Sequence, residues 1–287
     1  MSGKEQKALT LIAVTGTNGK TSTASMLDAI YRKAGMKTAL FGTLGMTVNG
    51  NCEVSDNTTA LPEILYRKLK EAKEQSVERV VMEVSSHALA THRTAELSFS
   101  SAIYTNLTQD HLDYHKTMQS YAEAKLMLFR QCEKGIFNYD DPYSYFASQI
   151  SPCAAFGYGQ RSGCDFRLLT VHQKSLSQVA YTFSHRMQTY RIECPVFGDF
   201  HIYNTLAAVS TALLDGIPFA LIDEALREFR GVKGRTETLY DGAFSVMIDY
   251  AHTPDALFSV LSVLKKHTGS GEKRRLRVVF GCGGDRD

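Results

Sequence analysis

An apolar run near the start of the chain breaks into a polar, glycine-containing loop, in the sequence LIAVTGTNGKTST at Leu11 to Thr23. The apolar part predicts a buried strand, and Lys20 and Thr21 open a segment of helical spacing. Where a strand, a tight turn and a helix follow one another in this way, backbone N–H groups and the helix N-terminus form a binding site for phosphate. Gly16 and Gly19 suit such a turn. The segment therefore predicts a sheet with helices packed against it and a phosphate site at its edge.

The loop departs from the strict phosphate-loop pattern at one position. The pattern GxxxxGK[ST] requires a first glycine at position 14, where this chain has Val14. From the residues alone, a phosphate-binding loop and an ordinary strand-to-helix turn both remain open. In the first interpretation, Lys20 reaches the terminal phosphates and the Thr21 hydroxyl ligates magnesium.

Short β-branched runs alternate with helical stretches along the first half of the chain. This alternation is typical of an α/β fold, and we expect a P-loop-type, mostly parallel sheet flanked by helices. Gly35 suits the C-cap of one helix, and Pro62 suits the first turn of another. The expected strands are Thr10–Val14, Thr38–Thr43, Arg79–Val84, Ala102–Thr105 and Gly135–Tyr139, and the expected helices are Leu27–Ala34, Leu61–Ala72 and Met118–Cys132.

In the second half of the chain, the sequence pattern changes from alternating strands and helices to short consecutive strands. Between residues 165 and 196, the runs DFRLLTV, QVAYTF and TYRIECPV predict a small antiparallel side sheet. Two helical stretches follow, and GVKGR then supplies a glycine-rich hinge. Beyond the hinge, SVMIDY, a helix over 254–267 and the strand LRVVFG predict the beginning of a Rossmann-like β-α-β unit.

These segments suggest two domains. We expect a central ATP-binding domain over residues 1–233 and the start of a C-terminal domain over residues 234–287. The roughly 50 residues after the hinge are fewer than an independent domain usually needs, so we expect the chain to stop inside its last domain.

Composition narrows the class of protein. The 287 residues carry a formal net charge of +2 and are 44% hydrophobic, which is typical of a globular chain. Six scattered cysteines, the lack of an apolar run of about 20 residues and a polar N-terminus predict a reduced, cytoplasmic protein. The basic cluster at 273–277 lacks interleaved aromatic residues, so we interpret it as a solvated loop. We expect a monomer with no nucleic-acid or membrane partner.

Three further segments carry side chains suited to chemistry. Glu83 is at the end of an expected buried strand, where open α/β sheets bind ligands, although a solvent-facing glutamate is equally consistent with the pattern. The next residues, SSH, lack a GxSxG motif, which disfavours a serine nucleophile. The run DHLDYH contains His111 and suits metal binding or acid–base work, or simply a helix cap. Lys125 lies on the apolar side of a helix, where a lysine ordinarily extends its amine to solvent.

Nine short motifs occur in one order along the chain. Together they resemble the Mur ligase family and, within it, the MurE branch. GTNGKT is shared with folylpolyglutamate synthases, whereas EVSSH, DHLDYH and DYAHTPDAL in combination are specific to that branch. The family's loop begins at the glycine matching Gly16, so the presence of Val14 in place of a glycine does not argue against a phosphate-binding loop. The motifs are GTNGKTS, NTTA, EVSSHAL with His92-Arg93, TNLTQDHLDYH, YAEAK, GDFHIYNTLAA, GRTE, DYAHTPDAL and FGCGGDRD.

The resemblance implies an ATP-dependent amide ligase of peptidoglycan precursor synthesis. Such ligases use ATP and Mg²⁺ to phosphorylate a substrate carboxylate, and the amine of an incoming amino acid attacks the acyl phosphate. The MurE branch adds the third amino acid, diaminopimelate or lysine, to UDP-N-acetylmuramoyl-L-Ala-D-Glu. Phosphorylation removes the repelling charge and supplies a leaving group, so positioning and charge neutralisation dominate catalysis.

The resemblance also implies roles for matching residues. Lys20, His111 and Lys125 match catalytic positions, and Lys125 matches a lysine that is carbamylated, a reaction that requires a neutral amine. The matches for ATP are Gly16, Thr17, Asn18, Gly19, Lys20, Thr21, Ser22, Asn204, Arg235 and Asp249; those for the muramoyl peptide are Thr58, Thr59, Ser85 and Arg93; and those for metal are Thr21, Glu83, His111 and Lys125.

Two departures from the family keep alternatives open. We expect two domains of the family to be absent here, namely the uridine-nucleotide-binding domain and most of the C-terminal domain, which selects the third amino acid. One alternative is a related ligase of the folylpolyglutamate type that acts on another carboxylate. Another is a nucleotide-binding remnant without turnover.

Overall fold

The computed structural model describes residues 9–172, 178–268 and 275–281. Three sequence features lie wholly or partly outside these residues. They are the segment before Leu9, the basic residues Lys273 and Arg274, and the end of the FGCGGDRD motif at 282–287.

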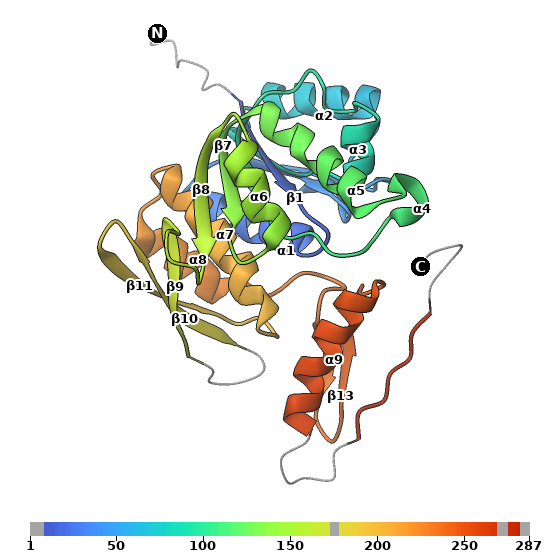
Figure 1. Ribbon diagram of the computed structural model, residues 1–287, viewed down its shortest axis with the longest axis vertical. Helices are drawn as coiled ribbons and strands as arrows, with labels where there is room; N and C mark the ends of the chain where they lie inside the picture. The colour runs from blue at the N-terminus through green and yellow to red at the C-terminus, as the bar shows by residue number, and fades with distance from the viewer. Residues whose placement is uncertain (1–8, 173–177, 269–274, 282–287) are drawn as a thin grey trace.

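One large sheet organises the main body of the protein (Figure 1). Within the described residues it has eleven strands, in the order β11-β10-β9-β8-β7-β6-β1-β5-β2-β3-β4. Every pairing from β9 to β2 is parallel, and the strands at both ends pair antiparallel, which confirms the mostly parallel sheet. The strands are β1 (Thr10–Thr15), β2 (Thr38–Gly42), β3 (Gly45–Val48), β4 (Asn51–Glu53), β5 (Arg79–Glu83), β6 (Phe99–Tyr104), β7 (Cys132–Asn138), β8 (Ala154–Gly159), β9 (Phe166–Val171), β10 (Val179–His185) and β11 (Gln188–Cys194).

Helices cover both faces of the parallel strands. On β1, Ile12 and Val14 belong to the apolar cluster of α1, α7 and α8, while Ala13 belongs to the cluster of α2, α5 and α6. Alternate residues of a strand face opposite sides, so burial at every position requires cover on both faces. The helices are α1 (Lys20–Lys33), α2 (Pro62–Glu74), α3 (Ser86–Ala90), α4 (Leu112–His115), α5 (Met118–Leu126), the 3₁₀ helix η1 (Met127–Arg130), α6 (Pro142–Ile150), α7 (Phe200–Leu214), α8 (Phe219–Glu228) and α9 (Pro254–Thr268).

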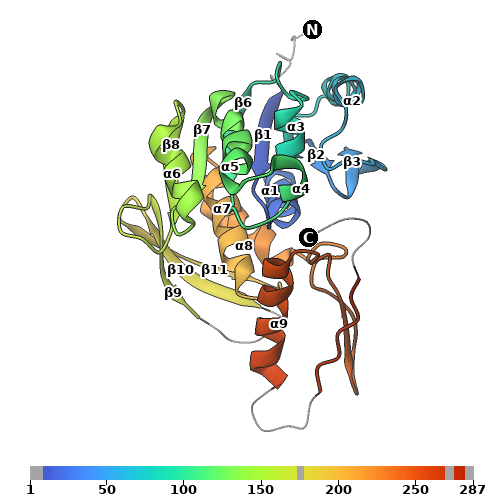
Figure 2. The ribbon, with the colours of Figure 1, turned by 45° about the vertical axis from the view of Figure 1, so that its right-hand side comes forward.

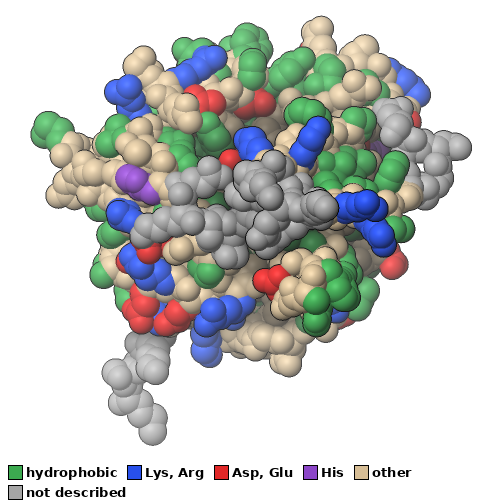
Figure 3. Space-filling view, turned by 90° about the horizontal axis from the view of Figure 1, so that it is seen from below, with side chains coloured by type: hydrophobic (Ala, Val, Ile, Leu, Met, Phe, Trp, Pro, Cys, Tyr) green, Lys and Arg blue, Asp and Glu red, His purple; other side chains and the backbone are tan. Residues whose placement is uncertain are grey.

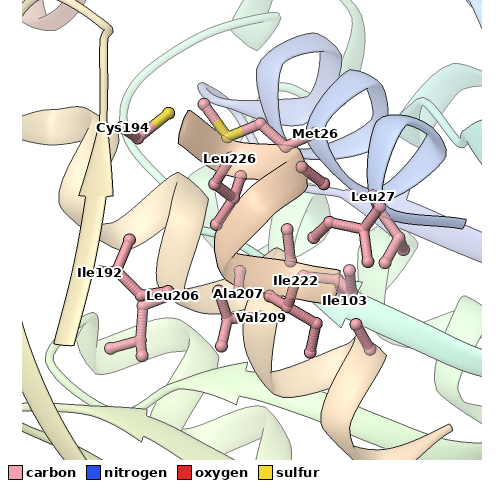
Figure 4. Packing of buried hydrophobic residues seen from close by; sticks show 14 of the residues in the cluster. Met26, Leu27, Ile103, Ile192, Cys194, Leu206, Ala207, Val209, Ile222 and Leu226 are labelled. Carbon is pink, nitrogen blue, oxygen red and sulfur yellow. The ribbon is translucent and has the colours of Figure 1, made fainter. Parts of the chain in front are cut away.

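Close packing joins α1 to α7 and α8 (Figure 4). Leu27 of α1, Leu206 of α7, and Ile222 and Leu226 of α8 are completely buried in one cluster. Burial of each such side chain contributes roughly 1.5–3 kcal/mol. This packing fixes the N-terminus of α1, and with it the glycine loop, relative to the first turns of α7.

The segment after the hinge stands apart from the main sheet. β12 (Glu237–Asp241) and β13 (Ser245–Ile248) form an antiparallel hairpin. The hairpin and α9 project together from the main body in Figures 1 and 2. The expected strand LRVVFG is wrong, because residues 275–281 form no strand and are exposed. A strand needs a neighbour for its backbone hydrogen bonds, and among the described residues β12 and β13 pair only with each other.

Three details of the main body refine the expectations. The expected antiparallel strands are present as β9 to β11, but they extend the main sheet through a short parallel pairing that includes Tyr158 and Phe166. Strands β3, β4 and β8 were not expected. The helix expected to reach Cys132 ends as an α-helix at Leu126, and Cys132 already begins β7.

Charges of both signs are mixed on the face of the molecule drawn in Figure 3. On this face, lysine and arginine side chains are separated by apolar, neutral and acidic ones. Arg275 and Arg277 of the basic cluster are exposed, as predicted for a solvated loop. In the described ranges, no helix has both the length and the apolar character that a membrane crossing demands.

Candidate active site

The glycine loop connects the end of β1 to the start of α1. Gly16 and Gly19 have φ values of 144° and 86°, which favour glycine. A Cβ at Gly16 would fall 1.8 Å from Thr105 Oγ1, and one at Gly19 would fall 2.3 Å from Asn204 Oδ1. No side chain caps α1 in the described structure, so the free N–H groups of its first turn face the loop. The loop thus has the open, positively polarised end that an anion requires.

Lys20 folds back onto the loop. Its Nζ donates to the carbonyl oxygens of Gly16 and Thr17, both at 2.8 Å. Burial lowers the pKa of Lys20, opposed chiefly by the charge of Glu83. A bound phosphate would offer this amine charged acceptors in place of the two carbonyls, which form weaker hydrogen bonds.

Glu83 ends β5 beside the first turn of α1. Its Oε2 accepts from Thr21 Oγ1 at 3.0 Å and from Thr43 Oγ1 at 3.2 Å, and its Oε1 accepts from Thr43 N at 2.9 Å. Arg235 Nη2 donates to the same Thr21 hydroxyl at 3.2 Å. A buried carboxylate next to a hydroxyl is a set of hard oxygen donors that suits Mg²⁺.

His111 lies in the loop before α4. Its φ of 54° and ψ of 27° place it in the left-handed region, which histidine adopts more often than most residues other than glycine. The ring contacts His87 and Tyr121 edge-on, and Nε2 lies 3.3 Å from Asp110 Oδ2. Burial lowers the pKa of His111 to about 4 against the opposing charge of Asp110. The ring is therefore neutral near pH 7 and keeps a lone pair for a metal or a proton.

Lys125 points inward rather than to solvent. The residue is 1% exposed, and its Nζ donates to Gly16 O at 2.9 Å and lies 4.5 Å from the centre of the Tyr121 ring. Burial, followed by the charge of Lys20, lowers the pKa of Lys125 well below its usual value. The alternative in which the amine extends to solvent is wrong. Lys125 lines neither of the two cavities described below.

Two cavities adjoin each other at the carboxyl ends of the parallel strands. The first, of about 380 Å³, is lined by Thr17 to Ser22, Glu83 and His111. The second, of about 490 Å³, is lined by the four residues matched to the muramoyl peptide, which are Thr58, Thr59, Ser85 and Arg93. The two cavities share Thr43, Thr58, Asp110, His111, Tyr250 and His252.

The C-terminal segment closes one side of the first cavity. Arg235 and Asp249 of this segment line it, as does Asn204 of α7. Both oxygens of Asp249 accept backbone N–H groups at 2.7 Å, from Thr236 and Ala251. Asp249 therefore fixes the backbone next to Arg235, and the Arg235 side chain reaches Thr21 beside the phosphate loop.

The structure brings most of the predicted site residues to one place. Of the residues matched to ATP, only Gly16 does not line the first cavity, and its carbonyl instead accepts from two lysines. Among the residues that both cavities share, the sequence analysis missed Thr43, Tyr250 and His252. Thr43 follows β2, and the rule that ligands gather at the carboxyl ends of parallel strands would have found it. Tyr250 and His252 lie in the motif DYAHTPDAL.

Within the described residues, no three His, Cys, Asp or Glu side chains lie close enough together to hold a metal by themselves. An ion near Glu83 and Thr21 would therefore take further ligands from phosphate oxygens and water, as Mg²⁺ commonly does. A glycine loop on a helix N-terminus, a strand-end carboxylate and an arginine reaching in from a following segment define the class of nucleotide-binding α/β proteins.

Comparisons with known proteins place the chain within that class. The Mur ligase middle domain matches residues 14–212, and the Mur ligase, glutamate ligase domain matches residues 234–287. The chain belongs to the Mur ligase family.

Among its relatives are two proteins named UDP-N-acetylmuramoyl-L-alanyl-D-glutamate--2,6-diaminopimelate ligase. The one from Bacillus velezensis is 39% identical over 99% of this chain and 59% of its own length. The one from Syntrophomonas wolfei is 41% identical over 99% of this chain and 58% of its own length. A solved structure of a ligase with the same name has a TM-score of 0.80 at 31% identity, covering 98% of this chain and 58% of that one. The chain thus spans somewhat more than half the length of these relatives.

More distant structures share the fold alone. MurF from Acinetobacter baumannii has a TM-score of 0.75 at 20% identity, over 91% of this chain and 55% of that one. A folylpolyglutamate synthase from Mycobacterium tuberculosis has a TM-score of 0.73 at 18% identity, over 91% of this chain and 67% of that one.

Proposed function

We propose that the chain is the ATP-using part of a MurE-type ligase, which joins a third amino acid to UDP-N-acetylmuramoyl-L-Ala-D-Glu. The observation that carries the proposal is the junction of the two cavities at Thr43, Thr58, Asp110 and His111. One cavity contains the phosphate loop, and the other contains the residues matched to the peptide substrate. A carboxylate bound in the second cavity would therefore face phosphates bound in the first.

In the first cavity, Gly16 to Ser22 would bind the triphosphate of ATP. Lys20 would exchange its two carbonyl partners for phosphate oxygens, and Arg235 would add positive charge from the C-terminal segment. Asn204 would meet the base, and Asp249 would keep Arg235 in place. These groups act chiefly by neutralising the charge that moves during phosphoryl transfer.

Thr21, Glu83 and His111 would hold Mg²⁺ together with the phosphates. The hydroxyl and carboxylate are 3.0 Å apart, and all three side chains line the first cavity. When bound, Mg²⁺ would supply charge neutralisation at the phosphate oxygens.

In the second cavity, Arg93 would recognise a carboxylate or phosphate of the muramoyl dipeptide through its planar fork. Its Nη1 donates to Thr59 O at 2.9 Å, which orients the guanidinium along the cavity wall. Ser85 N donates to Thr59 Oγ1 at 2.9 Å, and the hydroxyl oxygens of Thr43 and Thr58 lie 3.1 Å apart. The reacting carboxylate would be activated as an acyl phosphate and attacked by the amine of the third amino acid.

Lys125 would carry a carbamate formed with carbon dioxide. The neutral amine adds to the carbon of CO₂ and releases one proton, so the neutral side chain becomes an anion able to orient metal. Burial and the lowered pKa of Lys125 support this role, because they favour the neutral amine. Its contact with Gly16 O keeps it directly beneath the phosphate loop.

The proposal extends to the domain boundaries, the third amino acid and the oligomeric state. We propose a central domain over residues 1–233 and a C-terminal domain beginning at residue 234, with the hinge supported by the positive φ of Gly231 and Gly234. Diaminopimelate is favoured over lysine as the third amino acid, since the relatives above are named for it. We further propose a monomer that works in the cytoplasm, where ATP is available.

The test supplies the chain with ATP, Mg²⁺ and UDP-N-acetylmuramoyl-L-Ala-D-Glu, together with either diaminopimelate or lysine, and follows phosphate release. We expect release that depends on the dipeptide and is faster with diaminopimelate. Calorimetric titration with a non-hydrolysable ATP analogue separates binding from turnover.

Three outcomes distinguish the alternatives. Binding without release supports a nucleotide-binding remnant and contradicts a ligase that acts by itself. Release that depends on a folyl or polyglutamyl substrate, but not on the muramoyl dipeptide, supports the folylpolyglutamate-type alternative. Failure to bind the analogue contradicts the nucleotide site itself.

A further inference from the structure

His201 stands between the first cavity and the segment after the hinge. It is in the first turn of α7, is 4% exposed and lines the first cavity. Asn204 lies one turn further along the same helix, so the two side chains share a face. Phe200 and Tyr203 of this helix line the cavity as well, and their aromatic rings suit a planar base.

Each ring nitrogen of His201 has one partner. Nδ1 lies 3.2 Å from Asn204 Nδ2, and Nε2 lies 3.4 Å from Thr236 Oγ1. An amide nitrogen can only donate, so Nδ1 accepts and the ring proton sits on Nε2, which donates to Thr236. Burial lowers the pKa of His201 to about 4, and the ring is therefore neutral near pH 7.

This arrangement determines which way the Asn204 amide points. Because its nitrogen is held by His201, its oxygen faces the other direction, close over Gly19. In the part of the chain that the structure describes, no hydrogen bond ends on Asn204 Oδ1. The oxygen is left to accept a hydrogen bond from a ligand in the cavity.

A free amide oxygen distinguishes the two common purines. The amino group at C6 of adenine donates a hydrogen bond, whereas the oxygen at C6 of guanine accepts one. The C6 oxygen of guanine would face Asn204 Oδ1 with no proton between the two acceptor oxygens, and this unsatisfied contact disfavours guanine.

We propose that His201 is a positioning residue, which fixes the Asn204 amide and thereby makes the first cavity selective for adenine over guanine. The inference rests on the proposed function, because it requires a nucleotide in this cavity. It further connects base recognition to Thr236, next to Arg235 at the start of the C-terminal segment.

The experiment is calorimetric titration of the full chain with the β,γ-imido analogues of ATP and GTP in the presence of Mg²⁺. We expect the wild type to prefer the ATP analogue by about tenfold or more. His201→Leu removes Nδ1 and frees the amide to turn, so the preference should fall to within about threefold. His201→Asn is the matched control, since its side-chain oxygen can accept from Asn204 Nδ2 and should retain the preference.

The outcomes separate this inference from the proposed function. If His201→Leu binds the ATP analogue with its preference unchanged, the inference fails while nucleotide binding stands. Equal loss of preference in His201→Asn would assign the effect to packing and would also overturn the inference. If the wild type binds neither analogue, both proposals fail.

A second variant covers the possibility that His201→Leu does not fold, which circular dichroism would reveal. Thr236→Val keeps the shape of the side chain but removes the acceptor for Nε2, so the ring proton can move to Nδ1 and repel the amide nitrogen. We expect a smaller loss of preference, of about threefold. An unchanged preference in Thr236→Val, with His201→Leu unfolded, would overturn the inference.

Discussion

Two buried lysines, Lys68 on α2 and Lys125 on α5, have opposite surroundings. Lys68 Nζ lies 2.7 Å from Glu53 Oε2 and 2.8 Å from Glu71 Oε2, and these hydrogen bonds raise its pKa. Lys125 has no carboxylate within ion-pair distance in the described ranges, and burial lowers its pKa. A paired lysine fastens α2 to β4, whereas an unpaired one is a reactive amine whose burial is a cost to the fold.

Of these two lysines, only the unpaired one lies near the candidate active site. Lys68 lies at the outer edge of the sheet, and lines neither cavity. Lys125 lies beneath the phosphate loop, where burial without a counter-ion lowers its pKa and favours the neutral amine.

The largest expected effect is on turnover. Lys125→Met should lower phosphate release by roughly 10²–10³-fold, because the proposed carbamate, which would orient metal at the phosphates, is lost. Added bicarbonate should restore none of it. Lys68→Met is the matched control and should remain within about threefold of the wild type. A near-normal rate for Lys125→Met would remove the carbamate from the mechanism.

The second effect concerns the metal beside the loop. Thr21→Val removes the hydroxyl that contacts Glu83, and should weaken binding of an ATP analogue about tenfold with Mg²⁺ but little with EDTA. Thr23→Val on the same helix is the control, since the buried Thr23 hydroxyl has no partner among the described residues. Calorimetry measures both. Equal weakening with and without Mg²⁺ would argue against a metal at Thr21.

The third effect is on stability. Lys68→Met should lower the free energy of unfolding by about 1 kcal/mol, a modest cost because Glu53 and Glu71 keep contact with solvent. Lys125→Met should be at least as stable as the wild type, since it replaces an unpaired buried amine with an apolar side chain. Urea denaturation measures both variants. Strong destabilisation by Lys125→Met would mark that lysine as structural.

The smallest effect is the pH dependence of these stability differences. The folded-state pKa of Lys125 is below its unfolded value, so between the two the unfolded chain binds more protons and stability rises with pH. The advantage of Lys125→Met should therefore be largest near neutral pH and shrink toward pH ~10.

Lys68 should behave in the opposite way. Its folded-state pKa is raised, so its contribution is fully present below its unfolded pKa and is lost only above it. The cost of Lys68→Met should thus be constant between neutral pH and pH ~10. Urea denaturation in buffers free of carbon dioxide measures both slopes. A difference for Lys125→Met that does not change with pH would contradict the lowered pKa.

Local sequence patterns predicted many of the strands and helices. The apolar run before Gly16 and the helical spacing after Lys20 predicted β1 and α1 because hydrophobic period and turn chemistry are properties of neighbouring residues. The strand-end rule placed Glu83, and ordered motifs placed Arg93 and Asn204 around the cavities. The strand expected at LRVVFG failed, because a strand depends on a partner that local sequence does not specify.

The alternation of strands and helices, the loop at Gly16 to Gly19 and the family could all be recognised in the sequence. The burial of Lys125 without a counter-ion, the contact of Thr43 with Glu83 and the contact of His201 with the Asn204 amide could not. Periodicity and turn chemistry act over a few residues, whereas desolvation and hydrogen-bond orientation depend on groups brought together from distant parts of the chain.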